Sequence, residues 1–222
     1  MFSDIFNRDK PVFWKDYARH FKDKTSADLD KVRFVVFDTE TTGLDIGRDR
    51  ILSIGAVAIN NLKIDVGDSL EVYVKQEIFN PETVGIHGIL KEGNVPKLNE
   101  EEAIKIFLGY IENAVLVAHH AAFDIAMINI ALDRMGLPKL KNKVLDTGIV
   151  FKKTDFCKDR EEYFSLDRLC SLFNLKKHDR HTAAGDAFLT AMVFLKIVAN
   201  LSKNRILVLG DLFFNWDRRG LL

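Results

Sequence analysis

The sequence predicts an α/β fold in which a mixed β-sheet is flanked by helices, and three observations support this. A continuous apolar run at residues 32–37 has the length of a buried strand. Two strand-like segments follow it, and after residue 99 short apolar strands alternate with helical patterns. Because the first run is apolar on both faces, we expect it to be the central strand.

The next two strands are expected directly after the first. Residues 51–60, "ILSIGAVAIN", form the second, and residues 63–75, "KIDVGDSLEVYVK", show the partial alternation of a third. Asn60 and Asn61 are the expected turn between them, because asparagine is common in tight turns.

Helices and strands alternate in the second half of the chain. The expected helices begin or end at recognisable capping residues, such as Asn99, Ser165 and Gly136. The last helix carries an apolar stripe of Phe188, Met192, Leu195 and Ala199 on one side. In order, the expected elements are a helix at 99–112, a strand at 114–118, a helix at 123–138, a strand at 143–147, and helices at 165–173 and 184–201.

The chain is expected to have one main domain, at residues 31–202, with a helical N-terminal extension at 1–30 and a C-terminal tail at 203–222. In the extension, Trp14, Tyr17, Ala18 and Phe21 have the spacing of one helix face. That face either packs on the main domain or meets a partner, and the first interpretation is favoured because apolar stripes usually serve a protein's own core.

Composition and charge limit the classes of partner. Among 222 residues, Lys+Arg and Asp+Glu both number 32, so the net charge is zero. Nucleic acid would have to be held by local basic patches or by bound cations. Two cysteines and a start without a long apolar core suit a cytoplasmic protein. No run of ~18 apolar residues is present, so no membrane span is expected.

Four acidic residues are placed where strand ends and helix starts converge. Asp38 and Glu40 follow the first apolar run, and their spacing puts them on the same side of a strand. Asp124 lies at the start of the helix after "VLVAHH", and Asp186 lies about one turn into the last long helix. Close carboxylates need cations to offset their repulsion, and oxygen-only ligation suits Mg²⁺ or Mn²⁺.

Asp38 and Glu40 have two other interpretations. A solvated strand end is the simplest, and "DTE" alone is a weak motif. An aspartyl phosphatase uses two Asp residues at this spacing, but the second acid here is Glu and no matching downstream Lys–Asp signature is present. The acids further along the chain favour a metal site instead.

The chain closely resembles the DEDDh 3′→5′ exonucleases, which include the proofreading epsilon subunit of bacterial replicative DNA polymerase, RNase T and oligoribonuclease. The matching motifs are "FDTETTGLD" with Asp38 and Glu40, "AHHAAFD" with Asp124, and "HTAAGD" with His181 five residues before Asp186. A related subgroup has a catalytic Tyr four residues before that Asp, where this chain has Thr. Three ordered motifs make a specific signal, and the epsilon-like branch is the nearest.

The resemblance implies an RNase H-like fold and hydrolysis of nucleoside monophosphates from a 3′ end with two divalent cations, Mg²⁺ or Mn²⁺. Asp38 would bridge both cations, Glu40 and Asp186 would complete one site, and Asp124 would support the other. His181 would accept a proton from the attacking water, since histidine titrates near neutral pH.

The family also implies where the 3′-terminal nucleotide is held. The backbone of Thr41, Thr42 and Gly43 would contact it, with Gly43 permitting positive φ or the close approach of a sugar. Leu44 would wedge or stack at the terminal base. His87 and Phe123 are weaker candidates for substrate contact. For Phe123 the reason is that an aromatic at a helix start is usually core.

Two positions depart from the family pattern, and one basic cluster lies near the site. His120 stands where the second motif commonly has Asn, and Ser53 stands where relatives often have Glu. Lys176, Lys177 and Arg180, beside the third motif, are best placed to meet substrate phosphates.

Three functions remain open from the sequence. The leading hypothesis is an exonuclease acting on single-stranded DNA 3′ ends or frayed ends, alone or as a polymerase subunit, in proofreading or repair. An enzyme that trims RNA 3′ ends is the alternative within the family. A non-catalytic module that docks a polymerase through its termini is the third, although all four acids and the His are present.

Overall fold

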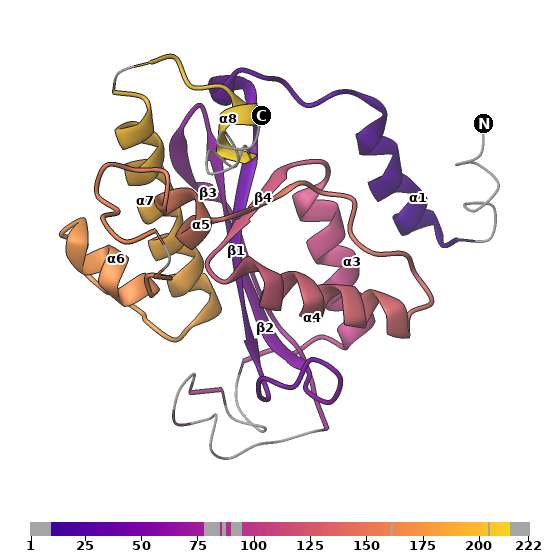
Figure 1. The fold of residues 1–222 in the computed structure, drawn as a ribbon. Helices are drawn as coiled ribbons and strands as arrows, with labels where there is room; N and C mark the ends of the chain where they lie inside the picture. Colours follow the sequence, from indigo (N-terminus) through magenta and orange to yellow (C-terminus); the bar gives the residue numbers. More distant parts are fainter. Residues whose placement is uncertain are drawn as a thin grey trace.

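The computed structural model describes residues 10–77, 85, 88–89, 95–160, 162–203 and 205–213, and it confirms a mixed five-stranded sheet. The strands lie in the order β3-β2-β1-β4-β5, so the first strand is central as expected (Figure 1). The first three strands pair antiparallel and the last two join in parallel. Their bounds are β1 Phe34–Thr41, β2 Ile51–Asn60, β3 Lys63–Tyr73, β4 Val115–Ala118 and β5 Val144–Asp146.

Helices cover both faces of the sheet because alternate residues of β1 are apolar on both sides. Phe34 and Val36 belong to one core cluster, and Val35 and Phe37 belong to the other. Figure 1 shows the two helical layers with the sheet between them. The first cluster is covered by α5 Thr147–Phe151, α6 Leu166–Leu172, α7 Ala183–Leu201 and α8 Leu209–Phe213. The second is covered by α1 Val12–Arg19, α3 Glu100–Ile111 and α4 Ala121–Arg134.

The expected capping residues set the helix ends. Asn99 forms a capping box with Glu102 at the start of α3, and the Ser165 hydroxyl accepts a hydrogen bond from Arg168 N–H at the start of α6. Gly136 follows α4 with φ of +66°, which is the left-handed conformation of a helix C-terminal cap. These local signals are visible in the sequence, and the structure confirms all three.

The β2–β3 hairpin differs from the expected turn by one residue. Asn60 pairs with Lys63, so Asn60 belongs to β2 and the loop consists of Asn61 and Leu62. Both loop residues have positive φ, at 50° and 54°, as two-residue hairpins of type I′ require. The expected Asn60–Asn61 turn was wrong because strand register places the second left-handed position on a leucine.

The long helix α7 is buried against β1 and β2 along most of its length. It is long and apolar enough to cross a membrane by composition, but Phe194 and Ile197 are fully buried in the core. Its composition is therefore that of a core helix. The stripe that includes Phe188 and Ala199 is the outer side of the helix, since Phe188 is 37% exposed.

The face of α1 packs on the main domain, as the favoured interpretation held. Trp14 and Tyr17 are buried in the same core cluster as α3. The Tyr17 hydroxyl donates to Asn142 Oδ1 at 2.7 Å and accepts from Lys141 N–H at 2.8 Å. At the other end of the extension, residues 27–28 lie beside residues 208–209, with Leu209 N–H donating to Ala27 O. The aromatic face is thus covered by the chain itself.

Candidate active site

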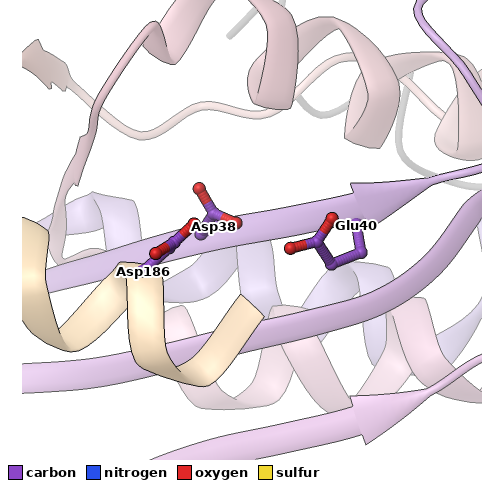
Figure 2. A group of neighbouring side chains, drawn as sticks. All are labelled: Asp38, Glu40 and Asp186. Atoms are coloured by element: carbon purple, nitrogen blue, oxygen red, sulfur yellow. The ribbon is translucent and has the colours of Figure 1, made fainter. Parts of the chain in front are cut away.

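Three carboxylates meet where β1 passes the first turn of α7. Strand β1 continues beyond Phe37, so Asp38 and Glu40 lie within it and project to the same side. Asp186 comes from the first turn of α7 and completes the group (Figure 2). One oxygen from each of the three carboxylates lies within 4.8 Å of the others. The structure therefore brings together three of the four expected acids in one compact group.

A glycine in β2 allows α7 to approach this closely. Gly55 pairs with Asp38 across the β1–β2 ladder. A Cβ atom at Gly55 would stand 2.2 Å from the backbone of Ala183 and Ala184, the first residues of α7. Backbone therefore packs on backbone here, and this contact seats Asp186 over β1.

Asp124 reaches the site from α4, on the opposite side of β1. Its Oδ1 accepts hydrogen bonds from Thr39 N–H at 2.9 Å and from the Thr39 hydroxyl at 2.7 Å. Asp124 is outside the three-carboxylate group, but its negative charge helps to raise the pKa of Asp38. Burial raises the pKa of Asp124 itself to about 7, and the bonds from Thr39 oppose that rise.

The group of three carboxylates concentrates negative charge, and one of its oxygens has no hydrogen-bond partner among the described residues. Burial, followed by the charges of Asp124, Asp186 and Glu40, holds the pKa of Asp38 well above its usual range. Burial and the neighbouring acids raise the pKa of Glu40 to about 7. Asp186 Oδ1 is buried and has no hydrogen-bond partner among the described residues. Clustered oxygen ligands with an unsatisfied buried oxygen fit a divalent cation such as Mg²⁺ or Mn²⁺.

His181 adjoins the carboxylates through its backbone, and its side chain lies outside the group. Its N–H donates to Asp186 Oδ2 at 3.3 Å, while the residue as a whole is exposed. The backbone of His181 is left-handed, with φ of 62°. The expected proximity of His181 to Asp186 is present in the backbone, and the residue as a whole is exposed.

The segment after Glu40 is held by its own hydrogen bonds. The Thr41 hydroxyl donates to Gly43 O, and the Thr42 hydroxyl donates to Asp49 Oδ1, both at 2.7 Å. Gly43 does not have positive φ, so of the two expected uses of this glycine only the close approach of a sugar remains. A Cβ atom at Gly43 would instead meet the Asp49 carboxylate at 2.5 Å. The threonine hydroxyls shape the loop, and Thr42 N–H is bonded to Arg50 O at 2.9 Å.

The remaining predicted contacts fall in three different environments. Leu44 is 84% exposed, as a wedge against a terminal base would need to be. Phe123 is half-buried and packs against the core cluster on the α3 side. His87 lies outside the described residues.

His120, which stands where the second motif commonly has Asn, is part of a hydrogen-bonded network. The ring of His120 stacks on Tyr163 with centroids 4.0 Å apart, and Tyr163 hydroxyl accepts from His120 N–H. Tyr163 donates to Asp146 Oδ1, and Ala121 N–H donates to Asp146 Oδ2. The network fixes the turn that leads into α4 and Asp124. Sequence reasoning missed Asp146, although it ends an apolar strand as Asp38 follows one.

Two further polar contacts border the carboxylates. Ser53 is 1% exposed and pairs with Glu40 across the β1–β2 ladder, so that departure lies beside the metal-ligand candidates. Arg180 contacts Asp186 and also Asp167 of α6. The sequence marked Arg180 only as one of several basic residues, because nothing in the local pattern pairs it with Asp167.

Comparisons with known proteins identify the family. The family model for RNase T-type exonucleases matches residues 35–194. DNA polymerase III subunit epsilon of Escherichia coli (strain K12) is 34% identical over 191 residues, covering 81% of this chain and 76% of that protein. The PolC-type DNA polymerase III of Caldanaerobacter subterraneus subsp. tengcongensis is 37% identical over 174 residues, covering 77% of this chain. The match spans 12% of that longer polymerase.

Solved exonuclease structures share the fold. Escherichia coli exonuclease I in complex with a dT13 oligonucleotide has a TM-score of 0.62 at 18% identity. That match covers 78% of this chain and 41% of exonuclease I. Exonuclease X in complex with 5′ overhanging duplex DNA has a TM-score of 0.57 at 23% identity, covering 76% of this chain and 91% of that one. The chain belongs to the RNase T-type exonuclease family, with DNA polymerase III subunit epsilon and PolC-type DNA polymerase III among its relatives, and is a 3′→5′ exonuclease.

Proposed function

We propose that this exonuclease releases nucleoside 5′-monophosphates from the 3′ ends of single-stranded or frayed DNA, in proofreading or repair. The observation that carries the proposal is the group of Asp38, Glu40 and Asp186 within 4.8 Å, with buried Asp124 on the other side of β1. Such a group of acids fits two divalent cations, Mg²⁺ or Mn²⁺. When bound, the cations would polarise the scissile phosphate and stabilise the attacking and leaving oxygens.

The chain's own residues would divide the work. Asp38, Glu40 and Asp186 would hold one cation. Asp38 would also contribute to the second cation, with support from Asp124. His181 would accept the proton of the attacking water at an imidazole nitrogen. The backbone of His181 already contacts Asp186, which keeps this exposed residue beside the carboxylates.

Substrate would be positioned by the segment after Glu40. The backbone of Thr41, Thr42 and Gly43 would contact the 3′-terminal nucleotide, and exposed Leu44 would pack on its base. An exposed apolar side chain beside a row of acids is well suited to stack on a base that has left the duplex. Phe123 and His87 would contribute less.

DNA is the favoured substrate because of the relatives. The relatives that match over most of this chain are named DNA polymerase III subunit epsilon or DNA polymerase III PolC-type, and solved neighbours are titled as complexes with DNA oligonucleotides. By the same reasoning, the partner in the cell would be a replicative polymerase in the cytoplasm. The family model takes its name from RNase T, so RNA has to be tested beside DNA.

The test is hydrolysis of a 5′-labelled single-stranded DNA oligonucleotide and its matched RNA, with Mg²⁺ or Mn²⁺. The wild type should give a ladder that shortens from the 3′ end of the DNA and stops when EDTA is added. Asp124→Asn and His181→Ala should both lose most of this activity while keeping the wild-type circular dichroism spectrum. Asp133→Asn, on the far part of α4, is a matched control.

Each outcome has a clear meaning. Faster cleavage of RNA than DNA by a large factor would overturn the DNA assignment and favour the RNA-trimming alternative. No cleavage of either substrate by a folded protein that binds Mn²⁺ would favour a docking module. Full activity of His181→Ala would show that His181 is not the proton acceptor.

A further inference from the structure

Arg180 is a cation beside the group of three carboxylates and contacts one of them, Asp186. Its guanidinium contacts Asp186 Oδ2, and it also donates to both oxygens of Asp167, at 3.2 Å and 2.9 Å. The Arg180 side chain is 19% exposed and that of Asp186 is 10% exposed. A pair so well shielded from water is screened weakly, so its charge acts strongly on the neighbouring acids.

The effect of Arg180 extends beyond the residue it touches. Its positive charge lowers the pKa of both Asp38 and Glu40, against the opposing influence of burial. It therefore offsets part of the repulsion among the three carboxylates in the way a bound cation would. The two acids that flank it also hold the pKa of Arg180 above its usual range, so the guanidinium stays charged.

The two oxygens of Asp186 have different roles. Oδ2 accepts from Arg180 and from His181 N–H, while Oδ1 is buried without a partner among the described residues. Oδ1 is thus available to a divalent cation, but a cation bound there lies next to the guanidinium on the same carboxylate. Like charges at this separation repel, so the ion pair opposes binding of the divalent cation.

Asp167 is a second carboxylate that binds the Arg180 guanidinium. Asp167 lies on α6, its side chain is 46% exposed, and Lys177 also pairs with it at 3.3 Å. Arg180 can lose its contact with Asp186 and still keep its two bonds to Asp167. Arg180 adjoins His181 in the chain, and the residues on either side of it, Asp179 and His181, both have positive φ.

We propose that Arg180 is an exchangeable counter-ion. It neutralises Asp186 when no divalent cation is bound, and it competes with that cation for the group of three carboxylates. The inference rests on the proposed function only in requiring that the carboxylates bind a divalent cation. Release of Arg180 from Asp186 would accompany cation binding and would free the His181 segment to rearrange.

The test compares Mn²⁺ binding by calorimetry in the wild type, Arg180→Gln and Lys177→Gln, without substrate. Arg180→Gln should bind Mn²⁺ at least about tenfold more tightly, a difference of about 1.4 kcal/mol. Lys177→Gln removes a charge from the same Asp167 but not from Asp186, so its Mn²⁺ affinity should stay within about twofold of wild type. After EDTA treatment, Arg180→Gln should also melt at a lower temperature than Lys177→Gln.

Three results would overturn the inference. Equal or weaker Mn²⁺ binding by Arg180→Gln would mean that Arg180 positions Asp186 for the cation. If Arg180→Gln does not fold, Arg180→Lys replaces it as the test, because lysine keeps the charge but lacks the planar guanidinium. Arg180→Lys should bind Mn²⁺ more tightly than the wild type does. Wild-type Mn²⁺ affinity in Arg180→Lys would contradict the proposed exchange. If the wild type binds no Mn²⁺, the metal site and the counter-ion both fail, whereas wild-type Mn²⁺ binding that Arg180→Gln does not tighten overturns the counter-ion alone and leaves the proposed function standing.

Discussion

The contact between β2 and α7 predicts that a single methyl group at Gly55 will disable the site. Gly55 lies directly beside Asp38 in the sheet, and its Cα faces the backbone of Ala183 and Ala184. In Gly55→Ala, the new Cβ would stand 2.2 Å from that backbone, whereas ordinary contact begins near 3.4 Å. Neither side can relieve the clash by rotating a side chain, because the groups that meet it are backbone atoms.

The size of the effect follows from the shortfall in distance. The difference between 3.4 and 2.2 Å requires α7 and β2 to separate by about 1.2 Å. Overpacking of this kind costs about 1–3 kcal/mol or more, which exceeds the roughly 0.5–1 kcal/mol that alanine gains over glycine. Asp186 moves with the first turn of α7, and a misplacement of ~1 Å in an active site can lower the rate by ~10²-fold.

The assay combines stability with single-turnover kinetics. Urea denaturation should show a loss of about 2 kcal/mol in the unfolding free energy of Gly55→Ala. Hydrolysis of a 5′-labelled DNA oligonucleotide at saturating enzyme should slow by about 10²-fold, and Mn²⁺ binding should weaken. Gly109→Ala on α3 is the matched control, because nothing lies within 4 Å of a Cβ there.

The control should behave in the opposite way. Gly109 is an exposed residue in the last turn of α3, so alanine should add up to about 0.5–1 kcal/mol of stability and leave the rate unchanged. If Gly55→Ala matches the wild type in both stability and rate, then α7 does not depend on this contact to place Asp186. A stable variant with a normal rate but weaker Mn²⁺ binding would separate the ligand geometry from the chemical step.

Two other predictions concern pH and the N-terminal helix. The folded-state pKa values of Glu40 and Asp124 are both about 7, which is higher than those of carboxyls in the unfolded chain. The folded, metal-free protein therefore binds more protons than the unfolded chain near neutral pH. Its stability should consequently fall as pH rises toward 8. Between pH 6.5 and 8 the EDTA-treated protein should lose about 1–2 kcal/mol, and saturating Mg²⁺ should abolish most of this loss in thermal melts; greater stability at pH 8 with EDTA would contradict the assignment. The lowered pKa of His119, about 4, acts in the opposite direction mainly below this range. Trp14→Ala should cost about 3–5 kcal/mol because Trp14 is fully buried, whereas Val12→Ala, at a side chain 72% exposed, should change stability by less than about 0.5 kcal/mol. A stable Trp14→Ala variant that lost only the binding of a polymerase would restore the docking interpretation of α1.

The sequence predicted the parts of this fold that depend on local pattern. The apolar run of β1 identified the central strand, the alternation of Asp38 and Glu40 identified their common side, and Asn99 and Gly136 marked helix ends. These succeed because burial and capping act on neighbouring residues. The RNase T-type family was found from three motifs whose order and spacing are visible in the chain.

Features that depend on tertiary contact were not predicted. The pairing of Arg180 with Asp167 joins residues 13 apart on separate elements, and no spacing rule connects them. Helix α5 was missed because its five residues are too few to show a helical period. The outer stripe of α7 was read as one apolar side, while its buried side is just as apolar and could not be distinguished by pattern alone.

The site depends on the place where β1 and β4 stop pairing. Their ladder extends only as far as Val36 opposite Val117, and β4 ends at Ala118. The N–H of Thr39, beyond that point, donates to the Asp124 carboxylate. Asp124 thus takes the hydrogen bond that a longer β4 would have made, and it enters from the α4 side while Asp186 enters from α7.

Opening of the sheet at this point therefore gives carboxylates access to β1 from both faces, at the carboxyl end of a central strand where α/β sheets place their ligands. Asp38 and Glu40 cannot form such a group from β1 alone, because a strand presents only one row of side chains on each face. The acids become a binding site only when α7 packs on Gly55 and α4 docks on Thr39. Cation binding and folding of these two helices are consequently linked, and an added cation should stabilise the whole domain.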